Sequence, residues 1–74
     1  MNIHVRLFAT LREGRDKTIE LELPENSTVA EVIRHLSLAR KDIAILLVGG
    51  HDAPLEKILT DGDTVSLFPP VGGG

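Results

Sequence analysis

Apolar and polar residues alternate over residues 2–9, the period of a strand with one buried face. One face carries three aliphatic side chains, Ile3, Val5 and Leu7, whereas Phe8 falls on the other face with His4 and Arg6. Alternation resumes over residues 18–23, where three aliphatic side chains are expected to point inward: Ile19, Leu21 and Leu23. The polar segment 11–16 between the two runs contains a glycine, so the pattern predicts a hairpin.

A helical period replaces the alternation from residue 28 onward. Four aliphatic residues recur at the spacing of one helix stripe: Val29, Val32, Ile33 and Leu36. Thr28 is expected to cap this helix in a capping box with Glu31, three residues on. The helix is expected to fade around residues 39–41, where basic side chains suit the negative end of its dipole.

The last part of the chain predicts two further strands. The apolar run 43–48, bounded by Gly49 and Gly50, indicates one strand, and residues 64–68 indicate the other. Residues 54–59 are expected to be irregular or to form a single helical turn, and residues 61–63 to form a turn. The order strand, strand, helix, strand, turn-rich segment, strand predicts an α+β fold, the β-grasp (ubiquitin-like) roll, with one main helix packed on one face of a mixed sheet.

Composition narrows the classes of function. The chain has 74 residues and no cysteine, so it forms one small domain without disulfides, zinc-thiolate sites or a cysteine nucleophile. Its net charge of -3 shows no basic footprint, and nucleic acid is not an expected partner. The longest apolar run is too short to span a bilayer, and the start of the chain lacks the pattern of a signal peptide, so we expect no membrane association and a cytoplasmic protein.

Side chains that often carry chemistry lack the spacing that chemistry requires. Three histidines are scattered over a strand, a helix and a loop, and we expect solvated surface residues rather than metal ligands: His4, His35 and His51. Residues 61–63 lack the further oxygen ligands of a calcium loop. No serine has the context of a nucleophile. We therefore expect no autonomous enzyme, no bound cofactor and no metal.

The remaining signals are an apolar surface and a tail. The only two aromatic residues, Phe8 and Phe68, take outward positions on strands that should be the adjacent parallel pair in the middle of the sheet. Together with Leu47 they predict an exposed patch that binds a partner, and truncating either ring should weaken binding more than folding. The alternative is that the loop after the helix, or Pro70, folds back over the rings.

Residues 71–74 are expected to form a flexible glycine tail beyond a domain of residues 1–70. Pro69 and Pro70 favour an extended chain that is directed away from the domain, and they are assigned to the partner interface together with Val71. Three glycines without side chains could thread a narrow cleft: Gly72, Gly73 and Gly74. The working group would then be the carboxyl of Gly74, which must be activated, most simply by ATP as an acyl-adenylate, before a nucleophile can attack it.

Residues 59–74, "LTDGDTVSLFPPVGGG", closely resemble the C-terminus of the small subunit of molybdopterin synthase, one of the MoaD/ThiS-like ubiquitin-like sulfur carriers. Residues 5–13, "VRLFATLRE", are similar to the first strand of that family and the segment after it. The resemblance implies that Gly74 is adenylated by an ubiquitin-activating-type enzyme, which uses the ATP, and converted with a sulfur donor to a thiocarboxylate. It also implies that the tail then inserts into a large synthase subunit, where sulfur passes to a precursor of the molybdenum or tungsten cofactor.

Three hypotheses remain open at this point. The first is this sulfur carrier, in the molybdopterin pathway or in a related pathway such as cysteine or thiamine synthesis. The second is an ubiquitin-like modifier, in which the same activated carboxyl ends in an amide on a lysine. The third is a non-covalent β-grasp binding module, for which the tail has no chemical role.

Overall fold

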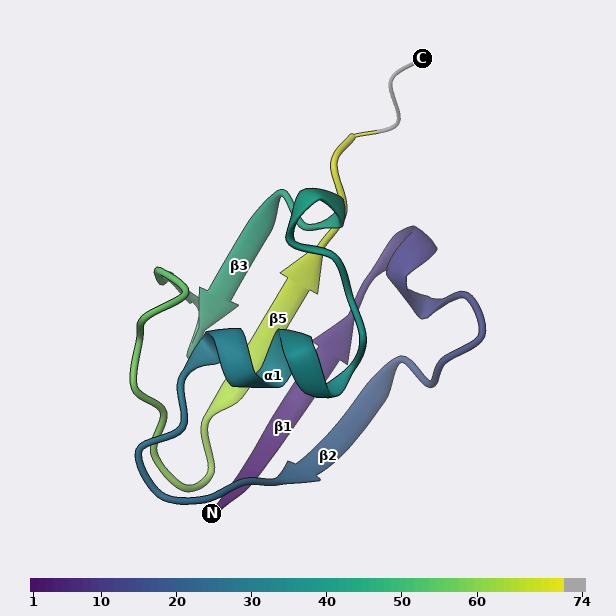
Figure 1. Cartoon of the computed structure of the whole chain (residues 1–74). Helices are drawn as coiled ribbons and strands as arrows, with labels where there is room; N and C mark the ends of the chain where they lie inside the picture. Colours follow the sequence, from purple (N-terminus) through teal and green to yellow (C-terminus); the bar gives the residue numbers. More distant parts are fainter. Residues whose placement is uncertain (72–74) are drawn as a thin grey trace.

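The computed structural model describes residues 1–71 and contains one sheet, one α-helix and two 3-10 turns (Figure 1). The strands are β1 (Asn2–Leu7), β2 (Thr18–Glu22), β3 (Ile45–Val48), β4 (His51–Asp52) and β5 (Thr64–Phe68). The helix is α1 (Val29–His35), and the 3-10 turns are η1 (Ala9–Arg12) and η2 (Arg40–Asp42). Gly72, Gly73 and Gly74 lie outside the described residues, so the division into a domain of residues 1–70 and a tail of residues 71–74 stays a prediction.

The five strands form one mixed sheet in the order β2-β1-β5-β3-β4. The central pair, β1 and β5, is parallel, and the other three pairs are antiparallel. The helix α1 crosses one face of the sheet (Figure 1). This is the α+β architecture of the β-grasp roll, so the predicted fold class is confirmed.

The hydrophobic core lies between α1 and the sheet. The inward residues of β1 and β5 are the most deeply buried: Ile3, Val5, Leu7, Val65 and Leu67. The helix contributes Val29, Val32 and Ile33 of the predicted stripe, whereas the fourth member, Leu36, caps the helix and packs against the core half-buried. The remaining side is closed by Leu46, Val48 and Leu59. Side chains alternate across a strand, and no helix among residues 1–71 covers the other face of β1, β5 and β3.

The prediction missed β4 and began β3 too early. Gly49 and Gly50 have φ angles of 60° and 84°, as a two-residue hairpin turn requires, and they return the chain so that Val48 pairs with His51. Ile43 is buried, but it follows η2 rather than belonging to β3. The apolar run therefore predicts the right strand, and the two glycines at its end form a hairpin turn.

The first strand is also shorter than the predicted 2–9. It ends at Leu7, Phe8 remains extended, and Ala9 takes a positive φ of 51° at the start of η1. This turn buries Leu11 in the core, although the sequence placed it in a polar turn region. The predicted turn at residues 61–63 is present, and it is held to β1 because the Asp61 carboxylate accepts a hydrogen bond from the backbone N–H of Asn2 at 2.7 Å.

The start of α1 is as predicted, but the capping box is not formed. Thr28 is the N-cap residue, yet its side chain makes no capping hydrogen bond, and the Glu31 carboxylate pairs with Arg34 instead. The free N–H groups of Val29 and Ala30 donate to the carbonyls of Lys57 and Leu55. The irregular segment 54–59 therefore satisfies the donors that a capping side chain would otherwise serve.

The helix ends at His35, several residues before the predicted 39–41. Ser37 adopts a left-handed φ of 56°, its N–H donates to the Arg34 carbonyl, and the N–H of Leu38 donates to the Ile33 carbonyl. These two hydrogen bonds define a Schellman ending, a motif in which glycine usually takes the left-handed position. The sequence offers serine there, so the stop signal is not visible in composition.

Among residues 1–71, no helix is long and apolar enough to cross a membrane.

The left-handed serine gives a prediction about stability. We expect Ser37→Gly to raise the free energy of unfolding by about 0.5–1 kcal/mol, because glycine adopts this conformation without the steric cost of Cβ. Urea unfolding measures the change. Ser37→Ala is the control and should give no gain, since alanine keeps Cβ. A Ser37→Gly protein less stable than the parent would contradict the assigned ending.

Candidate functional site

Three apolar side chains form a row across the uncovered face of the sheet. The parallel register pairs Leu7 with Leu67, which places Phe8 beside Phe68 one residue further on. The antiparallel register pairs Phe68 with Ile45. The row therefore runs from β1 over β5 to β3, at the end of the sheet where β5 finishes.

The two phenylalanine rings are in direct contact. Their centroids lie 4.2 Å apart and their planes differ by 10°, so the rings are stacked. The guanidinium carbon of Arg6 lies 5.3 Å from the centroid of the Phe8 ring, within the range of a cation–π contact. Both rings are half-buried and keep part of their surface open to solvent. The predicted proximity of Phe8 and Phe68 is therefore confirmed.

Leu47 lies on the same face one row further from the end of the sheet, where it pairs with Ser66. It is half-buried, whereas Ile45 is 48% exposed. We call Phe8, Ile45, Leu47 and Phe68 the outer patch. The sequence reasoning named Leu47 and missed Ile45, although residues 45 and 47 share the same parity in the apolar run.

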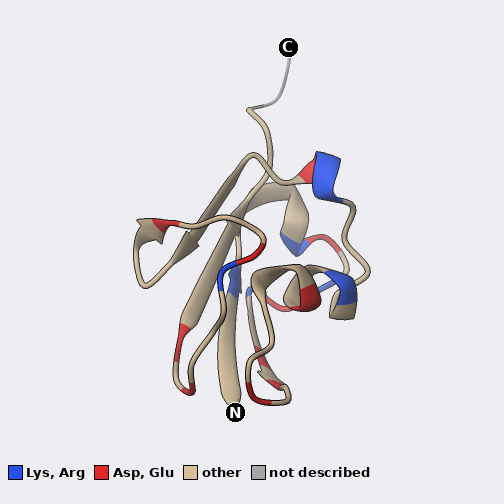
Figure 2. Ribbon diagram, turned by 60° about the vertical axis from the view of Figure 1, so that its left-hand side comes forward, with Lys and Arg blue, Asp and Glu red and all other residues tan. Residues whose placement is uncertain are grey.

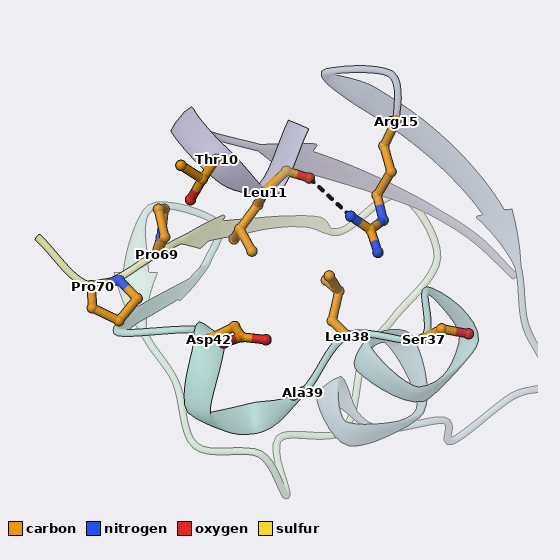
Figure 3. Close-up of a pocket in the computed structure, with 9 residues that line it drawn as sticks. All are labelled: Thr10, Leu11, Arg15, Ser37, Leu38, Ala39, Asp42, Pro69 and Pro70. Carbon is orange, nitrogen blue, oxygen red and sulfur yellow. Dashed lines mark hydrogen bonds between the residues drawn. The ribbon is translucent and has the colours of Figure 1, made fainter. Parts of the chain in front are cut away.

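The loop after the helix and Pro70 do not line the outer patch. They lie instead around a groove at the end of β5, with a volume of about 260 Å³, which we call the exit groove (Figure 3). Its lining comes from η1 and the residues around it, the loop after α1, η2, and the segment after β5: Thr10, Leu11, Arg15, Ser37, Leu38, Ala39, Asp42, Pro69 and Pro70. The alternative that this loop or Pro70 covers the rings therefore receives no support.

Two charged side chains border the exit groove, Asp42 on the side of the two prolines and Arg15 on the opposite side (Figure 3). In Figure 3 the Arg15 side chain extends toward Leu11, and its guanidinium donates to the Leu11 carbonyl at 3.5 Å. The Asp42 side chain extends into the groove from η2. Pro69 is half-buried and Pro70 is exposed, and Val71 has 94% of its surface exposed. The predicted tail residues Gly72, Gly73 and Gly74 lie outside the described residues.

The histidines do not converge. His4 pairs with Glu20 on β2 at 3.2 Å, His35 ends α1, and His51 lies on β4. In the part of the chain that the structure describes, no group of three or more histidine, cysteine or acidic side chains could hold a metal ion.

Comparison with known proteins agrees with this geometry. The model of the ThiS family matches residues 5–74. Small archaeal modifier protein 3 of Haloferax volcanii is 33% identical over 92 residues, and the match covers all of both chains.

Solved structures of two similar proteins have the same fold. SAMP1 of Haloferax volcanii superposes with a TM-score of 0.83 at 27% identity and full coverage of both chains. A Pyrococcus furiosus protein assigned as molybdopterin converting factor, subunit 1, has a TM-score of 0.80 at 28% identity, and the match covers 96% of this chain and 99% of that one.

The burial of the rings gives a prediction. Phe8→Ala should lower the free energy of unfolding by about 1–2 kcal/mol, because the ring is only half-buried. Leu67→Ala removes a fully buried side chain from the neighbouring strand and should cost about 2–5 kcal/mol. Urea unfolding of both variants makes the comparison. An equal or larger loss for Phe8→Ala would show that the ring belongs to the core.

Proposed function

The chain belongs to the ThiS family, whose members are ubiquitin-like sulfur carriers, and we propose that the carboxyl of Gly74 carries the sulfur. The single observation that carries the proposal is the position of the outer patch. Phe68 ends β5, and Pro69 and Pro70 follow it directly, so the patch lies where the chain leaves the sheet. A partner that binds the patch thereby receives the residues that follow it.

The proposed chemistry takes place on the carboxyl group alone. A carboxylate oxygen of Gly74 attacks the α-phosphate of ATP, pyrophosphate leaves, and an acyl-adenylate forms. A sulfide equivalent from a sulfur donor then attacks the carbonyl carbon, AMP leaves, and a thiocarboxylate remains. This chain contributes the acyl group and the docking surface, and the catalytic side chains belong to its partners. No bound cofactor is required on this chain.

Two protein partners follow from this scheme. The first is an ubiquitin-activating-type adenylyltransferase, which binds ATP and the tail. The second is a large synthase subunit, which accepts sulfur from the thiocarboxylate and transfers it to a molybdopterin precursor. The Pyrococcus furiosus relative, assigned as subunit 1 of a molybdopterin converting factor, supports the second partner. We propose the outer patch, with Pro69, Pro70 and Val71, as the surface that both partners bind.

A second candidate function uses the same activated carboxyl. Both Haloferax volcanii relatives are named as small archaeal modifier proteins, SAMP1 and protein 3, and they favour a role as an ubiquitin-like modifier. In that role a lysine amine attacks the acyl-adenylate or a thioester derived from it, and an amide forms. The two functions therefore differ in the nucleophile and share the surface and the tail.

The requirement for a free carboxyl gives a prediction. One alanine added after Gly74 should abolish ATP–pyrophosphate exchange by the activating enzyme, because the carboxyl is displaced by one residue from the site that fits it. Deletion of Gly73 and Gly74 should have the same effect. A control with one alanine added before Met1 should keep full exchange. Undiminished exchange by the extended chain would overturn the role of Gly74, and undiminished biological function would favour a non-covalent module.

The outer patch gives a separate prediction. Ile45→Asp should weaken binding to the activating enzyme by about tenfold or more, because it places a charge in the apolar centre of the interface. Ile58→Asp is a matched control, since Ile58 is 54% exposed and Ile45 is 48% exposed, and only Ile45 lies on the patch. Calorimetric titration measures both affinities, and thermal unfolding verifies that both variants fold. Equal losses for the two variants would contradict the assignment of the interface.

A further inference from the structure

A second groove lies on the helix side of the molecule, away from the outer patch. It has a volume of about 310 Å³ and is formed by α1, the loop after it and the segment before Thr60. Its lining is Ala30, Ile33, Arg34, Leu38, Arg40 and Leu55. We call it the helix groove. None of these residues belongs to the outer patch or to the proposed tail.

The floor of the helix groove is aliphatic. Leu38 and Leu55 are half-buried and pack against the core, and Ile33 lies beneath them with 6% of its surface exposed. The Schellman ending of α1 places Leu38 here, because its N–H donates back to the Ile33 carbonyl. Leu55 is held against the start of the helix by the hydrogen bond from the N–H of Ala30. The apolar floor is thus built by backbone contacts that the fold requires.

The rim of the groove is basic. Arg34 and Arg40 both line it, and no acidic residue does. The guanidinium of Arg40 is oriented by a 2.8 Å hydrogen bond to the Ile43 carbonyl, and Arg34 pairs with Glu31 on the helix surface. His35 and Lys41 adjoin the two arginines in sequence. This basic site stands out on a chain whose net charge is -3.

The acidic side chains lie mostly away from the basic rim of the helix groove. In Figure 2 blue segments lie on α1 and η2, each beside a red one, whereas the loops near the N-terminus carry red segments without blue ones. Acidic residues in those loops and strands include Glu22, Glu25, Asp61 and Asp63. A negatively charged partner is therefore repelled from that end and attracted to the helix groove.

We propose that the helix groove binds an acidic segment of another protein, with aliphatic side chains on the floor and carboxylates at Arg34 and Arg40. Charge complementarity selects this occupant, because an apolar floor between cations fits leucine-like side chains flanked by acids. The groove and the outer patch lie on different faces, so a receptor at the groove leaves the patch open. The proposal goes beyond the sulfur-carrier function and does not depend on it.

The test is a titration of the full chain, labelled with nitrogen-15, with a short peptide in which two leucines are flanked by glutamates. We expect the NMR chemical shifts of four backbone amides to change: Ala30, Ile33, Leu38 and Leu55. The affinity for the peptide should fall as salt is added. Arg34→Gln and Arg40→Gln should each weaken binding by about two- to fivefold. Ala30→Glu should weaken it by about tenfold or more, because the new carboxylate occupies the groove and repels the peptide.

Ala44→Glu is the matched control, since Ala44 is also exposed and does not line the groove. Ala30→Glu should fold normally, because an acid in the first turn suits the positive end of the helix. Both variants should support pyrophosphate exchange, which separates this proposal from the function of Gly74. Three results would overturn the proposal. The peptide could change the chemical shifts of outer-patch amides only, or a peptide with serines in place of the leucines could bind equally well. The chemical shifts of the groove amides could also change with protein concentration alone, which would indicate that a second copy occupies the groove.

Discussion

The parallel pairing of β1 with β5 is the contact on which both faces of the molecule depend. Leu7 and Leu67 lie side by side in its register and are buried under α1, and one residue further on the rings of Phe8 and Phe68 stack on the opposite face. A slip of one residue would exchange core and surface along the strand. The same register that builds the core therefore also builds the outer patch and fixes where the chain leaves the sheet.

Strand periodicity predicted most of this arrangement, because alternation at residues 3, 5 and 7 and at 65 and 67 identifies the buried face directly. It also placed Phe8 and Phe68 together, since both have the opposite parity. Other features were not predictable because backbone contacts from distant segments set them. The carbonyls of Leu55 and Lys57 cap α1 in place of the Thr28 side chain, and a left-handed serine at position 37 ends it early. Ile45 was missed because a run that is apolar on both faces hides its parity.

Residues 1–71 present three surfaces to possible partners, of which the exit groove and the helix groove share Leu38. The outer patch is apolar and lies beside the end of β5, the exit groove surrounds Pro69 and Pro70, and the helix groove combines an aliphatic floor with two arginines. In the proposed function a carboxyl group delivers the chemistry of this small β-grasp domain, and these surfaces supply its specificity. That division suits a sulfur carrier and a modifier equally, because both functions start from the same activated glycine. The acceptor, rather than the fold, distinguishes them.

The most direct test of the account is the intact mass of the protein, purified from the organism that produces it with an N-terminal tag and an unmodified C-terminus. The account predicts a fraction in which one oxygen of the Gly74 carboxyl is replaced by sulfur, detected after rapid purification. Free carboxylate without any thiocarboxylate, together with species in which the chain is joined to lysines of other proteins, would contradict the carrier function. That result would assign the activated carboxyl to protein modification.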